Sequence, residues 1–134
     1  MRTALEFSFY AQAIAKKSTC LYQQVGAVVV QGDEIVGEGV NHNPPGWETC
    51  TQRGYCSVPN HTCGTQQQPS RAIHAELAAI AQAGHRARGA TLYCTHKPCE
   101  NCLKIAAAFG IKSVIYPGPP LSPEWSQVFM QKQI

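Results

Sequence analysis

The sequence lacks long hydrophobic runs, and charged residues are scarce. Only 14% of its 134 residues are charged and 44% are hydrophobic, which argues against a disordered chain or a coiled coil. Its longest apolar runs, such as GAVVV at residues 26–30, are far too short to cross a membrane. The opening stretch, MRTALEFSFYAQ, has no cleavage-site pattern, so we expect a cytoplasmic protein with no signal peptide. The small net charge of +3 suits a phosphate-bearing small molecule and gives no indication of a nucleic-acid partner.

Cysteine, in contrast, is abundant, with seven residues in this short chain. A secreted disulfide framework is one interpretation. The odd count, the expected absence of a signal peptide and the large aliphatic fraction all oppose it. Metal ligation in a reducing compartment is therefore the favoured interpretation.

The hydrophobic pattern predicts a single α/β domain over residues 1–134. Apolar residues at spacings of three and four indicate an amphipathic helix at residues 4–17. Four short runs read as strands, the first two as a hairpin: residues 25–31, 35–40, 90–95 and 112–117. The later strands each follow a helical segment, which implies crossovers and partly parallel pairing.

Two regions have no clear periodicity. Residues 41–70 contain four prolines and three cysteines, and an irregular segment of this length needs something to order it. After the last predicted strand we expect only a tail around Trp125 and Phe129. That tail and an apolar helix beginning at Ala72 are expected to offer surface for subunit contacts.

Two short motifs carry the chemistry. In IHAELAAIA, His74 is expected in the first turn of a helix, with Ser70 as the N-cap. In HKPCENC, Cys99 and Cys102 follow Pro98 at the start of another predicted helix, where the helix dipole stabilises thiolates. One histidine and two cysteines leave a tetrahedral zinc ion with one open position, as in catalytic sites.

Glu76 is the further residue of interest. Its angular offset from His74 on a helix makes it a poor fourth ligand, but it could reach a water molecule at the open position and move protons. Taken alone, CxxC could be a redox pair or half of a structural zinc site, and His-x-Glu could arise by chance. In this order, the two motifs match the H-x-E…P-C-x-x-C signature of zinc deaminases.

The sequence resembles the cytidine-deaminase-like superfamily and, within it, the deoxycytidylate (dCMP) deaminases. The resemblance covers about residues 7–117. It rests on these stretches: STC (18–20), VGAVVV (25–30), GVNHNPPG (39–46), HAELAAI (74–80), GATLYCTHKPCENC (89–102) and FGIKSVIY (109–116). It implies a three-layer α/β/α fold with a central mixed five-stranded sheet.

The resemblance also implies roles for individual residues. His74, Cys99 and Cys102 match the catalytic zinc ligands, and Glu76 matches the proton shuttle for attack of activated water on C4 of cytosine. Three residues match substrate-binding positions: Ala75, whose N–H would meet the pyrimidine O2, Asn41, near the sugar, and Ala27.

Family members with an inserted loop carry a second, structural zinc ion. Five residues are candidates here, without a choice of four among them: Cys20, Cys50, Cys56, His61 and Cys63. The alternative is that some of these cysteines are small buried hydrophobic residues. Cys94 is interpreted as a core residue, and His96 as either lining the pocket or bonded locally.

The resemblance further implies a homohexamer that dCTP activates and dTTP inhibits. Effector residues are expected at His42, Asn43, Gly46 and Lys17, where a triphosphate with Mg²⁺ could bind. The chain departs from the family's G-Y-N-G motif here, since Val40 replaces the tyrosine and His42 the final glycine.

The insertion between Asn41 and His74 favours dCMP as the substrate. The tRNA-adenosine enzymes have a shorter connection there, and a polynucleotide deaminase would show a more basic and aromatic groove. Another free-nucleotide or nucleoside cytosine deaminase is the alternative enzyme. A non-catalytic zinc-binding scaffold is the alternative of another class, although Glu76 would then have no use.

Overall fold

The computed structural model describes residues 3–19, 23–43, 46 and 73–133. The elements in chain order are α1 (Ala4–Ala15), β1 (Gly26–Gln31), β2 (Glu34–Val40), α3 (Ala75–Ala83), 3₁₀-helix η2 (Gly84–Ala87), β3 (Thr91–Cys94), α4 (Glu100–Ala108), β4 (Ser113–Tyr116), α5 (Pro123–Ser126) and β5 (Met130–Gln133). Among the described residues no helix is both long and apolar enough to span a bilayer.

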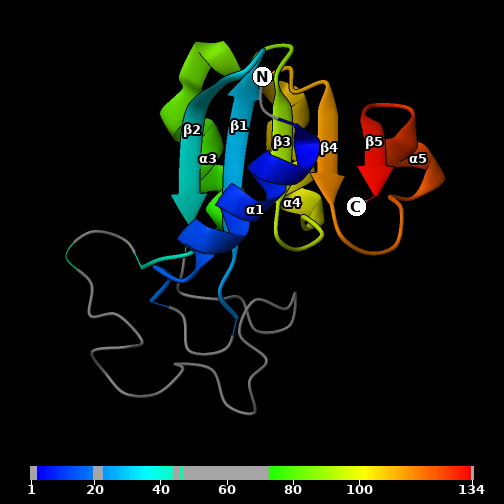
Figure 1. Cartoon of the computed structure of the whole chain (residues 1–134). Helices are drawn as coiled ribbons and strands as arrows, with labels where there is room; N and C mark the ends of the chain where they lie inside the picture. Colours follow the sequence, from blue (N-terminus) through cyan, green and yellow to red (C-terminus); the bar gives the residue numbers. More distant parts are fainter. Residues whose placement is uncertain (1–2, 20–22, 44–45, 47–72, 134) are drawn as a thin grey trace.

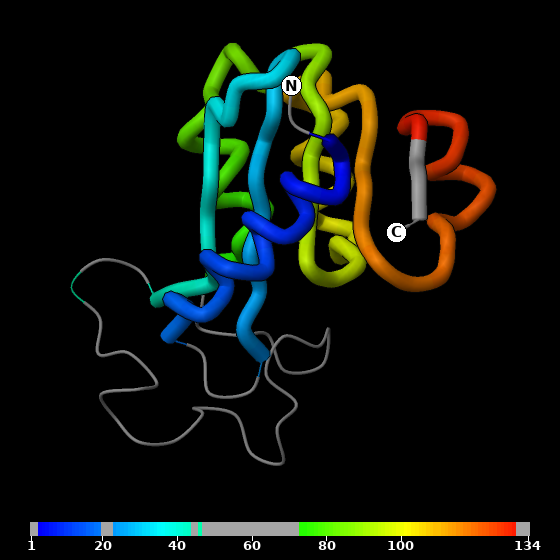
Figure 2. The backbone as a smooth tube through the Cα atoms, in the orientation of Figure 1, coloured from blue at the N-terminus to red at the C-terminus, as the bar shows by residue number. Residues whose placement is uncertain are grey.

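The strands form one mixed five-stranded sheet in the order β2-β1-β3-β4-β5, which confirms the predicted fold class (Figures 1 and 2). β1 pairs antiparallel with β2 and with β3. β4 pairs parallel with β3 and with β5. The predicted hairpin, later strands and partly parallel pairing are therefore all present.

The fifth strand, β5, was not among the strands predicted from the sequence pattern, which indicated only a tail. Its sequence, MQKQ, lacks the alternation of a half-buried strand. It forms because its backbone extends the edge of β4, with Met130 N donating to Lys112 O over 2.9 Å. Phe129, just before it, is only 2% exposed and stacks on Trp125 at 5.9 Å. The expectation that Phe129 offers surface for subunit contacts is therefore wrong.

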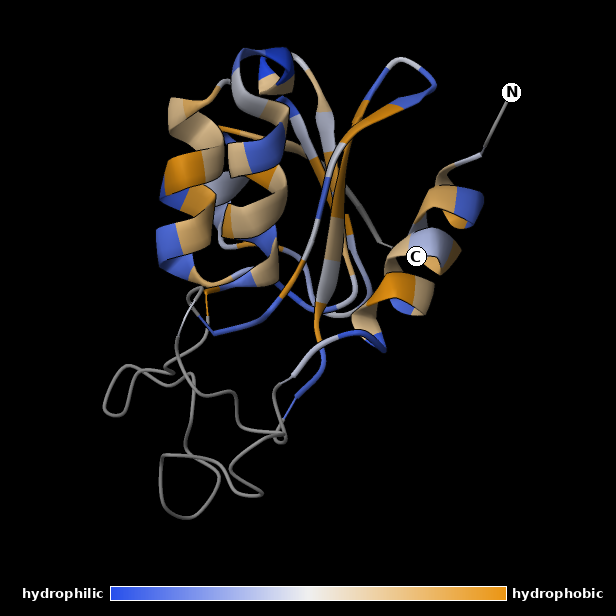
Figure 3. Ribbon diagram, turned by 90° about the vertical axis from the view of Figure 1, so that its left-hand side faces the viewer, coloured by the Kyte–Doolittle hydropathy of each residue, from blue (hydrophilic) through white to orange (hydrophobic). Residues whose placement is uncertain are grey.

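Helices cover both faces of the sheet, giving three layers. Figure 3 shows α1 on one side and α3 with α4 on the other, with hydrophobic strands between them. Successive residues of β1 pack on opposite faces of the sheet, because successive side chains of a strand point in opposite directions. Val28 and Val30 pack in the cluster with Phe7 of α1, whereas Val29 packs in the cluster on the α3 side.

Helix α3 lies very close to β2. A Cβ atom added at Gly39 would lie 2.6 Å from the carbonyl oxygen of Ala75, and one at Gly37 would lie 2.2 Å from that of Ala79. Only glycine therefore permits this approach, which sets the position of the amino end of α3.

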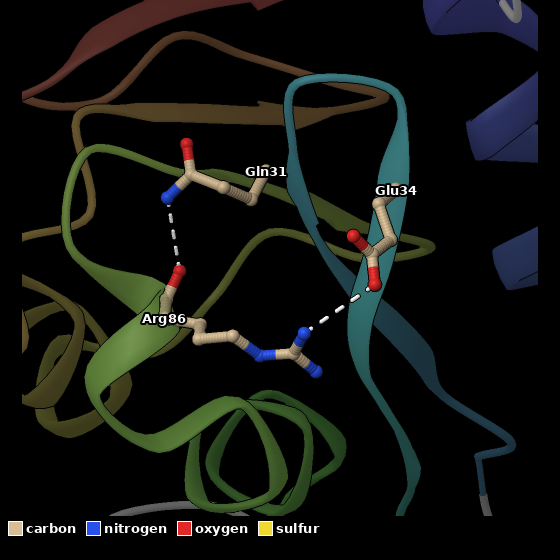
Figure 4. Close-up of polar contacts among 3 residues, drawn as sticks. All are labelled: Gln31, Glu34 and Arg86. Atoms are coloured by element: carbon tan, nitrogen blue, oxygen red, sulfur yellow. Dashed lines mark hydrogen bonds and ion pairs between the residues drawn. The ribbon is translucent and has the colours of Figure 1, made fainter.

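The segment that follows α3 is bonded to the tip of the β1–β2 hairpin (Figure 4). Gln31 Nε2 donates to the carbonyl oxygens of Arg86 and Arg88 at 3.0 and 2.8 Å, and the Arg86 guanidinium pairs with Glu34 at 3.3 Å. These groups are exposed, so each contact contributes little stability. Together they join the hairpin tip to η2, after α3.

Candidate metal centre and neighbouring pockets

The two chemical motifs lie at the amino ends of two neighbouring helices. His74 is the N-cap of α3, with extended backbone angles, and Cys99 is the N-cap of α4. The predictions that α3 begins at Ala72 with Ser70 as N-cap, and that Pro98 lies in the first turn of α4, are therefore wrong. The reason at α3 is a β-bridge between Ile73 and His42, which keeps residue 73 extended and delays the helix.

The side chains of His74, Cys99 and Cys102 converge on one point. Their ligand atoms all lie within 4.8 Å of one another. His74 Nδ1 is 3.5 Å from Cys99 Sγ and 3.4 Å from Cys102 Sγ. Tetrahedral zinc with ordinary Zn–N and Zn–S bonds requires N···S separations of about 3.6 Å. The donor set and its spacing therefore fit a zinc ion with three protein ligands.

The three groups are also electrostatically coupled. The pKa of Cys99 is lowered to about 4, first because Cys102 hydrogen-bonds to its sulfur and then because His74 does. The pKa of Cys102 is raised, since its proton is held against the Cys99 sulfur. The hydrogen bond to Cys99 also raises the pKa of the His74 ring. Cys99 is thus favoured as the thiolate, the form that binds metal.

Glu76 lies in the first turn of α3 and is 5% exposed. It is not one of the three converging ligands, in agreement with its predicted offset from His74. Burial is the main cause that raises the pKa of its carboxyl group. Cys94 is fully buried, and burial followed by the charge of Glu76 raises the pKa of its thiol. Cys94 is a core residue, as predicted.

Of the residues matched to substrate binding, Ala75 directly follows the converging ligand His74 in the chain. Ala75 opens α3, and Ala27 lies on β1 opposite Cys94 of β3; all three belong to the hydrophobic cluster on the α3 side. A cavity of about 440 Å³ reaches two of the converging ligands from between the helices. It is lined by His74, Leu77, Asn101, Cys102, Lys104 and Ile105.

Asn41, matched to a sugar-binding position, has its side chain bonded to the protein backbone. Its Oδ1 accepts from Val25 N at 2.9 Å, and its Nδ2 donates to Gln23 O at 2.6 Å. Sequence reasoning missed these bonds, since no local pattern connects residue 41 with residues 23–25.

Of the effector candidates, Lys17 and His42 line one cavity of about 240 Å³ between α1, β2 and α3. His42 Nδ1 is 2.8 Å from Val40 O. Asn43 is buried, and Gly46 has a φ of +88°, a conformation that favours glycine. Lys17 and His42, from segments before β1 and after β2, thus lie together at this cavity.

The five candidates for a second zinc site lie outside the described residues: Cys20, Cys50, Cys56, His61 and Cys63. His96 is within the described residues, and its Nδ1 is 2.8 Å from Thr95 Oγ1. This contact confirms the expectation of a local bond for His96.

Comparisons with known proteins agree with this site. The family model for the cytidine and deoxycytidylate deaminase zinc-binding region matches residues 1–117. A deoxycytidylate deaminase of Mycobacterium phage D29 is 38% identical over 114 residues, which are 80% of this chain and 88% of that protein. One of Schizosaccharomyces pombe is 35% identical over 114 residues, but the chain spans only 35% of its length.

Among solved structures, the apo dCMP deaminase of cyanophage S-TIM5 is similar over the full length of both chains. Its TM-score is 0.76 at 26% sequence identity. The matched region includes both helix starts that carry His74, Cys99 and Cys102. The chain belongs to the cytidine and deoxycytidylate deaminase family of zinc-binding proteins.

Proposed function

We propose that this protein catalyses the hydrolytic deamination of dCMP to dUMP and ammonia, which supplies dUMP for dTTP synthesis. The observation that carries the proposal is the buried Glu76 beside three converging ligands that fit zinc. The named relatives support the substrate, since those of phage D29 and S. pombe are both deoxycytidylate deaminases.

In the proposed mechanism His74, Cys99 and Cys102 hold the metal and Glu76 moves the protons. Bound zinc supplies Lewis acidity, which lowers the pKa of water to about 7. Glu76 takes a proton from the attacking water and delivers it to N3 of cytosine as C4 is attacked. It then transfers the second proton to the amino group, which leaves as ammonia. Its raised pKa suits a group that must both accept and donate a proton.

The pocket walls are proposed to orient the base. The Ala75 backbone N–H, at the amino end of α3, would donate to the pyrimidine O2, because the first N–H groups of a helix have no partner within it. Ala27 is proposed as a small apolar residue of the pocket because of the family resemblance at residues 25–30.

Regulation by triphosphates is proposed for the cavity between α1, β2 and α3. Lys17 supplies positive charge there and His42 an imidazole ring, opposite the acidic Glu38 in the same lining, and Asn43 and Gly46 follow on the loop after β2. In this proposal dCTP with Mg²⁺ activates and dTTP inhibits a homohexamer. A second, structural zinc ion would order residues 41–70.

A non-catalytic zinc-binding scaffold is the competing function. Burying a carboxylate beside an open metal position costs stability and would bring a scaffold no benefit, which favours the enzyme.

The test is an assay of zinc-loaded protein that follows ammonia release and the ultraviolet change from cytosine to uracil. The substrates are dCMP, dCTP, CMP, deoxycytidine and an adenosine-containing RNA. We expect dCMP to have the highest kcat/KM. A clear preference for another substrate would overturn the choice of dCMP, and no turnover of any would favour the scaffold.

A further inference from the structure

The first helix is apolar on its outer side as well as on the side that packs on the sheet. α1 packs on β1, β2 and β3, and none of the described elements lies over its outer side (Figures 1 and 3). Leu5 is nevertheless 49% exposed and Phe9 is 56% exposed. With the exposed Ala13 they are spaced by four residues, so the three form one stripe along the helix. A surface helix normally carries polar residues on its outer side, and a helix that is apolar all round is normally buried.

Charged residues lie only at the two ends of this stripe. Glu6, in the first turn, is the one charged residue within Ala4–Ala15, and Lys16 and Lys17 follow the helix directly. All three are exposed, and none forms an ion pair with another residue that the structure describes. The described part of this helix surface is therefore acidic at its start, apolar in its middle and basic at its end.

A second copy of the same helix fits this pattern. When two copies of α1 pack antiparallel, the acidic start of each lies beside the basic end of the other. The register that places Glu6 of one copy opposite Lys17 of the other also places Phe9 beside Ala13, whose small side chain leaves room for the ring. The same contacts then occur twice, as a two-fold interface requires. A parallel pair would instead bring the two Glu6 carboxylates together.

The pattern fits a lipid surface less well. A helix that lies on a membrane carries basic residues along its polar face, whereas the lysines of α1 follow its end and Glu6 lies at its start. The area is also that of a contact within an assembly. Phe9 exposes about 110 Å², and a pair of short helices buries less than the roughly 1,200 Å² of a stable isolated dimer.

We propose that the outer side of α1 is a contact surface between two copies of this chain, packed antiparallel through Phe9 and Ala13 with Glu6 against Lys17. The pair is one contact of the proposed homohexamer, and it does not depend on deaminase activity. It also brings the second copy to Lys17, which lines the cavity of about 240 Å³ between α1, β2 and α3.

Charge reversal tests the pairing, with the mass of the oligomer measured by sedimentation over a range of protein concentrations. Glu6→Lys and Lys17→Glu each place like charges at both ends of the contact and should weaken association by about tenfold. An equimolar mixture of the two variants should restore association, because one chain then faces the other with opposite charges at both ends. Glu124→Lys, at an exposed position outside α1, is the control and should leave association unchanged.

Recovery in the mixture is the decisive measurement. Any loss of helix stability caused by either reversal persists in the mixture, so recovery reports a contact between two copies. Weakened association without recovery would overturn the antiparallel pair. An oligomer that neither reversal changes would also overturn it.

Phe9→Gln tests the apolar centre of the contact. It should weaken association by at least about tenfold and leave the free energy of unfolding nearly unchanged, because the ring is exposed in the single chain. Unchanged association, or binding to phosphatidylcholine–phosphatidylserine vesicles that Phe9→Gln abolishes while the oligomer persists, would overturn the proposal. A wild type that is monomeric at every concentration would overturn both this contact and the homohexamer. A wild type inactive on dCMP would refute only the deaminase function, since association is measured without substrate.

Discussion

The backbones of His42 and Ile73 are joined by two hydrogen bonds. His42 N donates to Ile73 O at 3.2 Å, and Ile73 N donates to His42 O at 2.6 Å. His42 lines the cavity with Lys17, and Ile73 immediately precedes the candidate ligand His74. The hydrogen bonds between His42 and Ile73 therefore connect the lining of this cavity to the residue just before His74. A ligand bound in the cavity could alter the candidate metal centre through these bonds.

This connection leads to a prediction for Lys17. We expect wild-type kinetics to be sigmoidal in dCMP, with dCTP raising the rate and dTTP raising the apparent KM. Lys17→Met should weaken the response to dCTP, because it removes a positive charge from the cavity. Lys16→Met is the control, since Lys16 is exposed and does not line the cavity. Hyperbolic wild-type curves that millimolar triphosphates do not move would refute this regulation.

Glu76→Gln should keep the fold and the zinc content but lower kcat by at least about 10²-fold, since it removes only the proton carrier. Uracil formation and metal analysis on the same samples would measure both properties. Glu124→Gln makes the same chemical change at an exposed position and should leave both unchanged. Near-full activity of Glu76→Gln would show that another group moves the protons.

Metal analysis should find two zinc ions per chain. Cys50→Ser should lose one of them together with thermal stability, because metal binding to the inserted segment is coupled to its folding. Removal of all zinc with a chelator should abolish deamination, and added zinc should restore it. A single zinc ion in the wild type, or an unchanged content in Cys50→Ser, would exclude Cys50 from a second site.

Gly39→Ala should destabilise the protein by about 1–3 kcal/mol, the usual effect of overpacking. The new methyl group would lie 2.6 Å from Ala75 O, so it must also displace the amino end of α3 and lower activity. Gly32→Asn is the control, because Gly32 has no atom within 4 Å of an added Cβ and asparagine tolerates its φ of +63°. Urea unfolding and initial rates would test both variants. Equal stability of Gly39→Ala and wild type would contradict the close packing of β2 and α3.

Cys94 should make the free energy of unfolding depend on pH in the alkaline range. Burial raises the pKa of its thiol in the folded state, whereas the unfolded chain should titrate near about 8.5. Its contribution is therefore fully present below that pH and is lost as the pH rises above it, since only the unfolded state then releases the proton. The difference in free energy of unfolding between wild type and Cys94→Ala should shrink between pH 8 and about 10. A difference that stays constant over this range would contradict the effect.

Much of the fold could be predicted because its signals are local. β1 is recognised from its continuous apolar run, and β3 and β4 from their short β-rich runs. The spacing of apolar residues indicates α1. Each of these patterns lies within the element that it predicts. β5 could not be found in this way. Its polar sequence becomes a strand through pairing with β4, which lies more than ten residues earlier in the chain.

The sequence by itself determined the chemistry of the candidate centre, because the types and order of His74, Glu76, Cys99 and Cys102 already specify a zinc site with a carboxylate beside it. Only the tertiary structure decided where the helix that carries His74 and Glu76 begins, and which distant segments are bonded to one another around the site. The bridge from Ile73 to His42 makes His74 an N-cap, and the bonds of Asn41 fix residues 23–25. Local patterns cannot encode such contacts, since hydrogen bonds between distant segments depend on the packing of β2 against α3 and of β1 against β3.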